Sequence, residues 1–290
     1  MQADSDINLR DFLELLWQKK FLIVTTTLII SVCSLVYIIN EDNIYQSSAK
    51  LFNKSDVETS SIGSALGGIS GFLDVGNGSG SSTEYAISKL QSRDFFKIII
   101  QDENILKNIY AAKEYNSEDD KLIYDSTKLE HIKKNIYFEK AFENFRKNIF
   151  EINKNRSSGL ITIRVNHLSP VFARDLLELI IYQINLIISI EDEKESSNSL
   201  IFLENMYDDY SNITTRESII KLTEKNLEKK VLSQVNKENY IFKVVENPFI
   251  PEERIYPART QFMIMSIIIS FIFSIIISLA LIFVKKQKGQ

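Results

Sequence analysis

Two long apolar runs, one toward each end of the sequence, constrain the fold more than any other feature. Residues 21–39 (FLIVTTTLIISVCSLVYII) and 262–284 (FMIMSIIISFIFSIIISLALIFV) contain no charged side chain. At about 1.5 Å of rise per residue, each run as a helix can cross a hydrocarbon core of roughly 30 Å. A helix also satisfies the backbone hydrogen bonds of an isolated segment in lipid. We therefore predict transmembrane helices at 21–39 and 262–284, with the lipid bilayer as a partner.

The first run has a second interpretation, as a cleaved signal peptide, because it follows Lys19 and Lys20 near the N-terminus. The run is long for a signal core, and the polar stretch before it is also long. Asn40, Glu41 and Asp42 follow it in place of small residues typical of a cleavage site. These features favour a retained anchor.

Basic residues next to the two runs predict the orientation of the chain. They precede the first run and follow the second, at Lys19, Lys20, Lys285, Lys286 and Lys288. Lysine and arginine are enriched on the cytoplasmic side of membrane spans. We expect cytoplasmic segments at 1–20 and 285–290 and an extracytoplasmic domain at 40–261.

This domain must be held together by its own core. The one cysteine, Cys33, lies inside the first apolar run, so the domain has no cysteine for a disulfide. Its length is sufficient for a hydrophobic core. The chain has a formal net charge of -4, which argues against nucleic acid as a partner.

The first half of this domain contains a strand, a glycine-rich segment and several helix signals. Alternation predicts a strand at 44–52, and the glycines and serines of 55–82 predict a flexible loop, since no phosphate-binding GxxxxGK[ST] motif occurs there. Ser82 or Thr83 is placed to cap one helix through EYAISKLQSRDFFKIII. Ser117 and the acidic residues after it resemble another helix start, and 139–149 predicts a short helix.

The second half contains a strand, a turn and a long helix. The segment 160–165 (LITIRV) predicts a strand, Ser169 is placed as a helix cap, and Pro170 takes the first helical position. The apolar run 176–190 could be read as a third membrane span. It is short, however, and contains Glu178, Gln183 and Asn185, so we predict a helix packed in the domain.

That long helix is expected to reach about residue 207 and to pair with a second helix. Thr214 and Glu217 have capping-box spacing, and Ile220, Leu227 and Val231 form one stripe of a helix ending near residue 236. We predict a protruding helical hairpin over about 170–236, followed by a short strand near 240–245. The expected fold class is α+β, with two transmembrane helices bracketing an extracytoplasmic α/β base that carries the hairpin.

Three of the four prolines, Pro248, Pro251 and Pro257, lie just before the second apolar run. Proline fixes φ and lacks a backbone donor, so this proline-rich segment, 248–257, is expected to be extended and stiff. The alternative is a linker that merely prevents helix formation.

The chain resembles the Wzz-type chain-length determinants of bacterial surface polysaccharides, also called polysaccharide co-polymerases. The resemblance follows the order of the motifs: INLRDFLELLWQKKFLIV, the strand near Tyr45, LQSRDFFKIII with Ser92 and Arg93, the strand and helix around Pro170, and the prolines before the second span. The family often spaces its prolines by three, whereas Pro251 and Pro257 are six apart with Arg254 midway.

The resemblance implies a function and partners. Members are non-catalytic inner-membrane proteins with two spans, and their main domain is periplasmic. They form homo-oligomers that set the length of a growing polysaccharide, such as O-antigen-like lipopolysaccharide, made by a Wzy-type polymerase. The residues implied as structural or coupling motifs are Pro248, Pro251, Pro257, Pro170, Ser92 and Arg93.

Motifs for catalysis are missing from the sequence. It has two histidines, His131 and His167, and no HExxH, GxSxG or Walker motif. We therefore expect no enzyme activity, no cofactor and no metal site. The alternative function is an envelope component of capsule or exopolysaccharide export. A sensor is less favoured, because neither cytoplasmic segment is long enough for an output domain.

Overall fold

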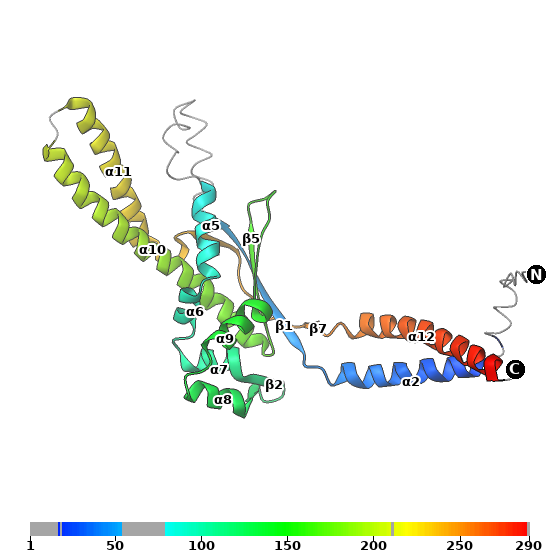
Figure 1. Cartoon of the computed structure of the whole chain (residues 1–290). Coiled ribbons are helices and arrows are strands. Elements are labelled where there is room, and N and C mark those ends of the chain that lie inside the picture. Colours follow the sequence, from blue (N-terminus) through cyan, green and yellow to red (C-terminus); the bar gives the residue numbers. More distant parts are fainter. Residues whose placement is uncertain (1–16, 18, 54–78, 210–211, 289–290) are drawn as a thin grey trace, which may run out of the picture. The chain divides into compact units, whose positions relative to one another are not determined.

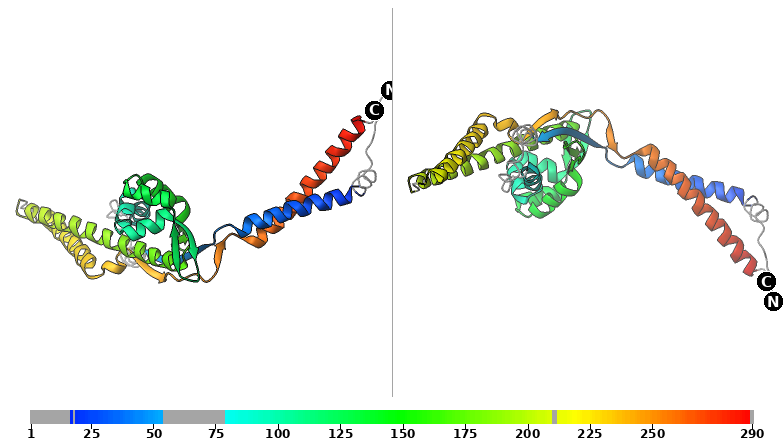
Figure 2. Two further views of the ribbon diagram at one scale, coloured as in Figure 1. Left: turned by 90° about the horizontal axis from the view of Figure 1, so that it is seen from below. Right: turned by 90° about the horizontal axis from the view of Figure 1, so that it is seen from above.

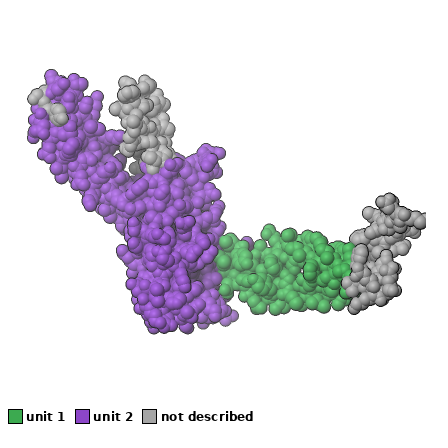
Figure 3. Space-filling model, viewed as in Figure 1, with its two compact units in different colours: residues 1–44, 254–290 green, residues 45–253 purple. Residues whose placement is uncertain are grey.

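The computed structural model describes residues 17, 19–53, 79–209 and 212–288. Most of the predicted glycine-rich loop, 55–82, and most of the N-terminal segment, 1–20, lie outside these described residues. The chain divides into two compact units, one formed by residues 1–44 and 254–290 and the other by residues 45–253 (Figures 1 and 3).

The first unit contains two apolar helices and a short strand. Helix α2 (Lys20–Ile39) and helix α12 (Arg259–Lys288) cover the two predicted spans, and strand β7 (Arg254–Tyr256) precedes α12. Both helices are long and apolar enough to cross a membrane, over 20–39 and 259–281. They pack against each other (Figure 2) and run antiparallel, since the ring of Tyr37 near the end of α2 lies 6.3 Å from that of Phe262 near the start of α12.

Small hydroxyl side chains line the contact between α2 and α12. Ser270, Ser274 and Ser278 recur one turn apart on α12 and are buried. Ser274 Oγ donates to the carbonyl oxygen of Ile23 (2.9 Å) and contacts the Thr26 hydroxyl. Small polar residues allow close helix approach and interhelical hydrogen bonds in lipid. The two helices are therefore joined by specific polar contacts.

The second unit is built on an antiparallel sheet. Its strands lie in the order β4 (Phe150–Lys154), β5 (Ile161–His167), β1 (Ile44–Asn53) and β6 (Phe242–Glu246). In the register, Leu51 faces Ile161 and Ala49 faces Ile163 across β1 and β5. Alternate residues of β5 are buried, as the period of two in its sequence predicts.

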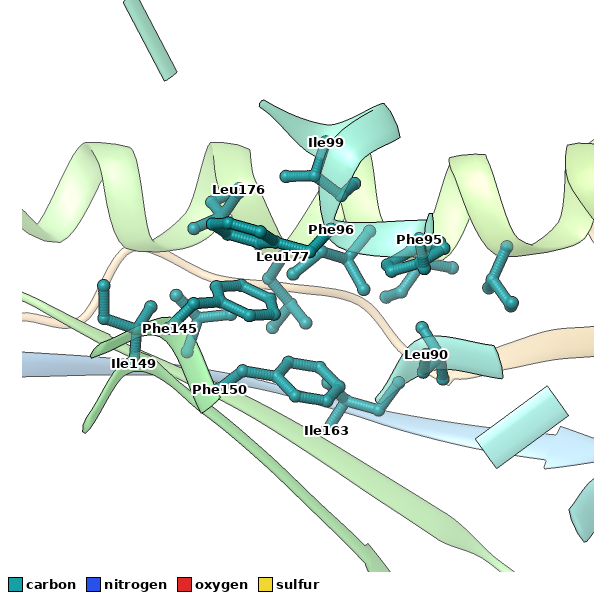
Figure 4. Packing of buried hydrophobic residues seen from close by; sticks show 14 of the residues in the cluster. Leu90, Phe95, Phe96, Ile99, Phe145, Ile149, Phe150, Ile163, Leu176 and Leu177 are labelled. Carbon is teal, nitrogen blue, oxygen red and sulfur yellow. The ribbon is translucent and has the colours of Figure 1, made fainter. Parts of the chain in front are cut away.

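Short helices cover the core of this unit. They are α5 (Ser79–Leu90), α6 (Arg93–Ile99), α7 (Glu103–Ala111), α8 (Ser126–Lys133), α9 (Phe138–Asn144) and the π-helical turn Phe145–Ile149. A separate hairpin pairs β2 (Ala112–Asn116) with β3 (Lys121–Tyr124). Figure 4 shows Phe96 and Phe145 packed in one buried cluster with Leu176 and Leu177, which lie on the long helix α10 (Pro170–Asp209).

A long helical hairpin completes the unit. Helix α10 (Pro170–Asp209) and helix α11 (Ile213–Val235) pack against each other (Figures 1 and 2), and a 3-10 turn, Lys237–Asn239, leads to β6. At about 1.5 Å per residue, α10 is roughly 60 Å long. Its core residues end at Ile188, so its second half packs mainly on α11. The expected α+β fold class, with apolar end helices and a helical hairpin, is confirmed.

Four local predictions are wrong. Ser117 begins a turn between β2 and β3 and not a helix, with Asp120 at φ 49°. Helix α5 begins at Ser79, so the predicted loop to residue 82 extends too far. The predicted single helix is interrupted, because α5 ends at Leu90 and α6 starts at Arg93. The cap of α11 is Asn212 and not Thr214, since Asn212 Oδ1 accepts from Thr214 N (3.1 Å).

One buried amide joins the hairpin to the sheet. Asn185, on α10, is fully buried. Its Oδ1 accepts from the backbone nitrogens of Ile241 (3.0 Å) and Phe242 (2.8 Å). Its Nδ2 donates to the carbonyl oxygens of Phe242 (3.2 Å) and Ile181 (3.1 Å). The side chain thus pairs with Phe242 as a neighbouring strand residue would, and it satisfies backbone groups at the edge of β6.

We predict that Asn185→Ala lowers the free energy of unfolding by more than about 2 kcal/mol, because it leaves buried backbone groups without partners. Chemical denaturation of the full chain in detergent measures this loss. Ser189→Ala is the matched control, because Ser189 is also fully buried on α10 but donates only to Leu186 O of its own helix (2.8 Å). Equal losses for the two variants would contradict the role of the Asn185 amide.

Candidate functional site

The structure places the predicted motif residues at four separate positions. Ser92 caps α6 and Arg93 is its first residue, Pro170 begins α10, and Pro248 and Pro251 follow β6. Pro257 lies in the first unit, after a cis peptide bond with Tyr256. In the described part of the chain, no hydrogen bond or ion pair joins any two of these motif positions to each other. They therefore do not form one site by direct contact.

Ser92 and Arg93 organise the start of α6. Ser92 Oγ accepts from Phe95 N (3.1 Å), so Ser92 is the N-cap of α6 and orients the buried Phe95 and Phe96. Arg93 Nη2 pairs with Glu139 Oε2 of α9 at 3.0 Å. Both side chains of this pair are well exposed, so the pair contributes little stability.

Pro170 lies in a local arrangement that starts the long helix. Ser169 Oγ accepts from Phe172 N (3.3 Å), as the sequence predicted for a cap. His167, at the end of β5, is buried, and its Nδ1 accepts from Ser169 N (3.1 Å). Its Nε2 lies 3.0 Å from Asn108 O of α7. With Nδ1 as acceptor, Nε2 carries the proton and donates, which makes this histidine neutral.

In the sequence, His167 is only one of two histidines that lie far apart. Burial lowers its pKa from 6.5 to about 4, although the hydrogen bond with Asn108 O partly opposes this shift. The side chain thus links β5, α7 and the start of α10 in its neutral form. No sequence motif marks this role, because Asn108 is distant in the chain.

The proline-rich segment is anchored to the sheet before it leaves the second unit. Ser47 of β1 is fully buried, and its Oγ donates to Phe249 O (2.8 Å), between Pro248 and Pro251. Pro251 is buried and Pro248 is partly buried. The first part of the segment is therefore held by a specific contact. Ser47 is a residue that the sequence analysis missed.

A row of carboxylates on α10 forms a second unpredicted feature. Glu191 accepts from Lys89 (2.7 Å) and Tyr85 (2.8 Å) of α5. Asp192 accepts from Tyr240 (2.7 Å), just before β6, and pairs with Lys229 of α11 at 3.0 Å. These contacts tie α5, α11 and the approach to β6 to one turn of α10. The run EDEKE inside a helical segment was the available sequence signal.

The pKa shifts in this row show that the contacts are partly desolvated. Burial, which by itself lowers the pKa of Lys229, is outweighed by hydrogen bonds with Asp192 and Glu195, so that its pKa is raised. Burial, together with the hydrogen bond to Asp192, raises the pKa of the Tyr240 hydroxyl. Lys229 is therefore charged and Tyr240 neutral near neutral pH, as these contacts require.

The apolar stripe of α11 does not face α10. Its members are spaced by seven or four positions and are all exposed: Ile213, Ile220, Leu227, Val231 and Val235. The buried residues of α11 are Ile219 and Ser233, on the opposite side of the helix. The predicted stripe therefore exists, but it is an exposed surface and not the contact within the hairpin.

In the described part of the chain, no group of three or more histidine, cysteine, aspartate or glutamate side chains is arranged to hold a metal ion. His131 contacts the Tyr110 hydroxyl through Nδ1 (3.0 Å), whereas His167 contacts Asn108 and Ser169. The notable features of the second unit are thus its organising contacts and its exposed apolar surface.

Comparison with known families identifies the N-terminal third of the chain. The Wzz family, described as "Chain length determinant protein", matches residues 5–103. The predicted resemblance to the Wzz family is confirmed. The Wzz match includes α2, β1, α5 and α6, and thus Ser92 and Arg93. It supports a role in the regulation of polysaccharide chain length.

Comparison with solved structures gives matches at low identity. One is a "full-length bacterial polysaccharide co-polymerase", with 10% identity, a TM-score of 0.46 and coverage of 98% of this chain and 100% of that chain. Another is a fragment of WzzB, a polysaccharide co-polymerase from Salmonella Typhimurium, with 12% identity, a TM-score of 0.35 and coverage of 74% and 100%. Both TM-scores are below 0.5. No curated protein sequence matches the chain.

We predict that the second unit loses stability in acid because His167 must be neutral. Its folded pKa of about 4 lies below the unfolded value of 6.5. The stabilisation is therefore complete above pH 6.5, and it is lost as pH falls toward 4, by about 3 kcal/mol in total. Denaturation of the full chain in detergent at several pH values measures it.

His167→Gln removes the titrating group and should flatten the stability profile between pH 6.5 and 4, at a lower stability overall. His131→Gln is the control for the loss of a histidine, and it should retain the steep profile. If the wild type and His167→Gln lose stability in parallel over this range, another group is responsible.

Proposed function

We propose that this chain is a non-catalytic regulator of surface polysaccharide chain length, of the O-antigen-like lipopolysaccharide kind, that acts with a Wzy-type polymerase. The observation that carries the proposal is the Wzz match over residues 5–103, combined with an apolar helix near each end of the chain. The hairpin of α10 and α11 supports it, because it offers a long surface for a partner or polymer without any motif for bond chemistry.

The two apolar helices support a location in the bacterial inner membrane. Lys19 and Lys20 precede α2, and Lys285, Lys286 and Lys288 lie at the other end of α12. We place these basic ends in the cytoplasm and residues 40–261 in the periplasm, by the preference of lysine for the cytoplasmic side. In this orientation, the growing polysaccharide and the hairpin share one compartment.

The motif residues are proposed to couple the periplasmic domain to the membrane helices. Ser47 anchors the chain between Pro248 and Pro251, and Pro257 lies two residues before the start of α12. A stiff segment transmits a displacement of the sheet to a helix better than a flexible one does. Ser92, Arg93 and Pro170 contribute by fixing the starts of α6 and α10, which pack in the same core.

The proposed function predicts a change in polymer length without this protein. Deleting the gene in a polysaccharide-producing strain should shift the modal chain length on a gel, and expression of the wild-type chain should restore it. A Pro251→Ala variant, present in equal amount in the membrane, should restore the mode incompletely if the segment couples to the membrane.

The same gels distinguish chain-length regulation from the main alternative function. If the protein is instead an export component, its loss should trap polymer of normal length inside the cell. An unchanged length distribution at the cell surface would contradict the proposed function.

The exposed stripe of α11 supports a homo-oligomer. Its five aliphatic side chains are between 44% and 79% exposed in the single chain, and an apolar surface of this kind favours a protein partner. We propose that a second copy of the chain covers it. The stripe faces away from α10, so this contact does not require the hairpin to open.

We predict that Leu227→Glu lowers the mass of the detergent-solubilised complex measured by light scattering. Leu227 is 51% exposed, so the charge does not disturb the fold, but it would be desolvated in a subunit contact. Lys225→Glu is the matched control on the same helix, because Lys225 is exposed and lies off the stripe. A wild-type chain that remains monomeric at all concentrations would contradict the oligomer.

A further inference from the structure

A shallow groove between α10 and α11 combines the two kinds of side chain that recognise sugars. It is lined by Asn198, Ser199, Phe202, Leu203, Leu222 and Asn226. These residues comprise two amides, one hydroxyl, one aromatic ring and two leucines, and none of them is charged. Figure 2 shows the two helices that contribute these residues, α10 and α11, packed against each other.

The register of the hairpin brings the two amides to one level. The helices run antiparallel, and Lys229 of α11 pairs with Glu195 of α10 at 3.0 Å. Three residues further toward the tip on each helix lie Asn226 and Asn198, and one further turn along lie Leu222 and Phe202. An amide level is thus followed by an apolar level across the same groove.

The polar groups at the first level suit hydroxyl groups of a ligand. Asn226 Nδ2 donates to Leu222 O (2.8 Å), which leaves its carbonyl oxygen Oδ1 to accept from a ligand hydroxyl. This part of the helix pair therefore has polar capacity that the hairpin itself does not use.

The aromatic group at the second level suits the apolar face of a sugar ring. Phe202 is 62% exposed although it borders the buried Leu203. A large exposed ring is costly in water unless another group covers it, and a flat aromatic surface favours stacking. The groove is also distinct from the stripe proposed for the subunit contact, since Leu222 and Asn226 lie on the α10 side of α11.

We propose that this groove binds neutral sugar residues of the growing polysaccharide, with Phe202 stacked on a ring and Asn198 and Asn226 bonded to hydroxyl groups. The inference rests on the proposed function and names where the polymer contacts the chain. The absence of charge among the lining residues favours neutral sugars over uronic acids. Through this contact, the hairpin would hold a polymer that is long enough to reach the groove.

Saturation-transfer NMR tests this proposal with the full chain in detergent micelles. The probe is the lipid-free surface polysaccharide released by mild acid from the producing strain. The wild type should transfer saturation to the sugar protons, and Phe202→Ala should reduce the apparent affinity by about fivefold or more, as expected for loss of one stacking contact. Phe202→Tyr keeps the ring and should bind as the wild type does.

Ile201→Ala is the matched control. Ile201 is 61% exposed and adjacent to Phe202, but it does not line the groove, so its loss should leave binding unchanged. Equal binding by Phe202→Ala and the wild type would overturn the proposal. So would a fall in the mass of the oligomer for Phe202→Ala without a change in binding, because a second copy would then occupy the groove.

The outcomes also distinguish this inference from the proposed function. If gene deletion changes polymer length but Phe202→Ala binds normally, the groove assignment fails and the function stands. If deletion leaves the length unchanged, the function itself fails, whatever the groove binds.

Discussion

The buried amide of Asn185 connects the helical hairpin of the second unit to its sheet. Strand β6 reaches the sheet only after the chain has passed along α10 and back along α11, so its position is not determined by any short connection. Three of the four hydrogen bonds of Asn185 go to Ile241 and Phe242, and they set where this strand lies relative to α10. The fourth goes to Ile181 O within α10. A polar side chain is tolerated at this depth because every part of its hydrogen-bonding capacity is used.

The contacts next to Asn185 continue this connection along α10. About two turns later, Glu191 contacts α5 through Lys89. Asp192 contacts α11 through Lys229 and the segment before β6 through Tyr240. An apolar core holds the first part of α10 and a row of ion pairs holds its middle. Beyond these pairs α10 packs mainly on α11, so the end of the hairpin has surface left for partners.

Helix α11 divides its faces between these tasks. The side toward α10 carries Ile219 and Ser233, with the neutral groove near Asn226, and the other side carries the apolar stripe. In the proposed function, one side contacts polymer and the other contacts a second copy of the chain. A single helix pair would then link the number of subunits to the surface available for polysaccharide.

Several features were predictable from the sequence because their causes are local. The apolar runs are long enough to determine helices in lipid by themselves, and Ser169 with Pro170 starts α10 through contacts within one turn. Predictions failed where neighbours in space decide. The acidic residues after Ser117 suit a helix start and also a turn, and pairing of β2 with β3 favours the turn. Ser92 caps a new helix because Phe95 and Phe96 enter the core.

The sequence alone thus determined the two apolar helices, the strand and helix around Pro170, the presence of a hairpin and the resemblance to the Wzz family. These depend on composition and on residues close together in the chain. Only the tertiary structure decided that the stripe of α11 faces away from α10, that His167 is held neutral, and that Asn185 forms hydrogen bonds with the start of β6. Each of these depends on contacts between groups that are distant in sequence, and no spacing or motif predicts such contacts.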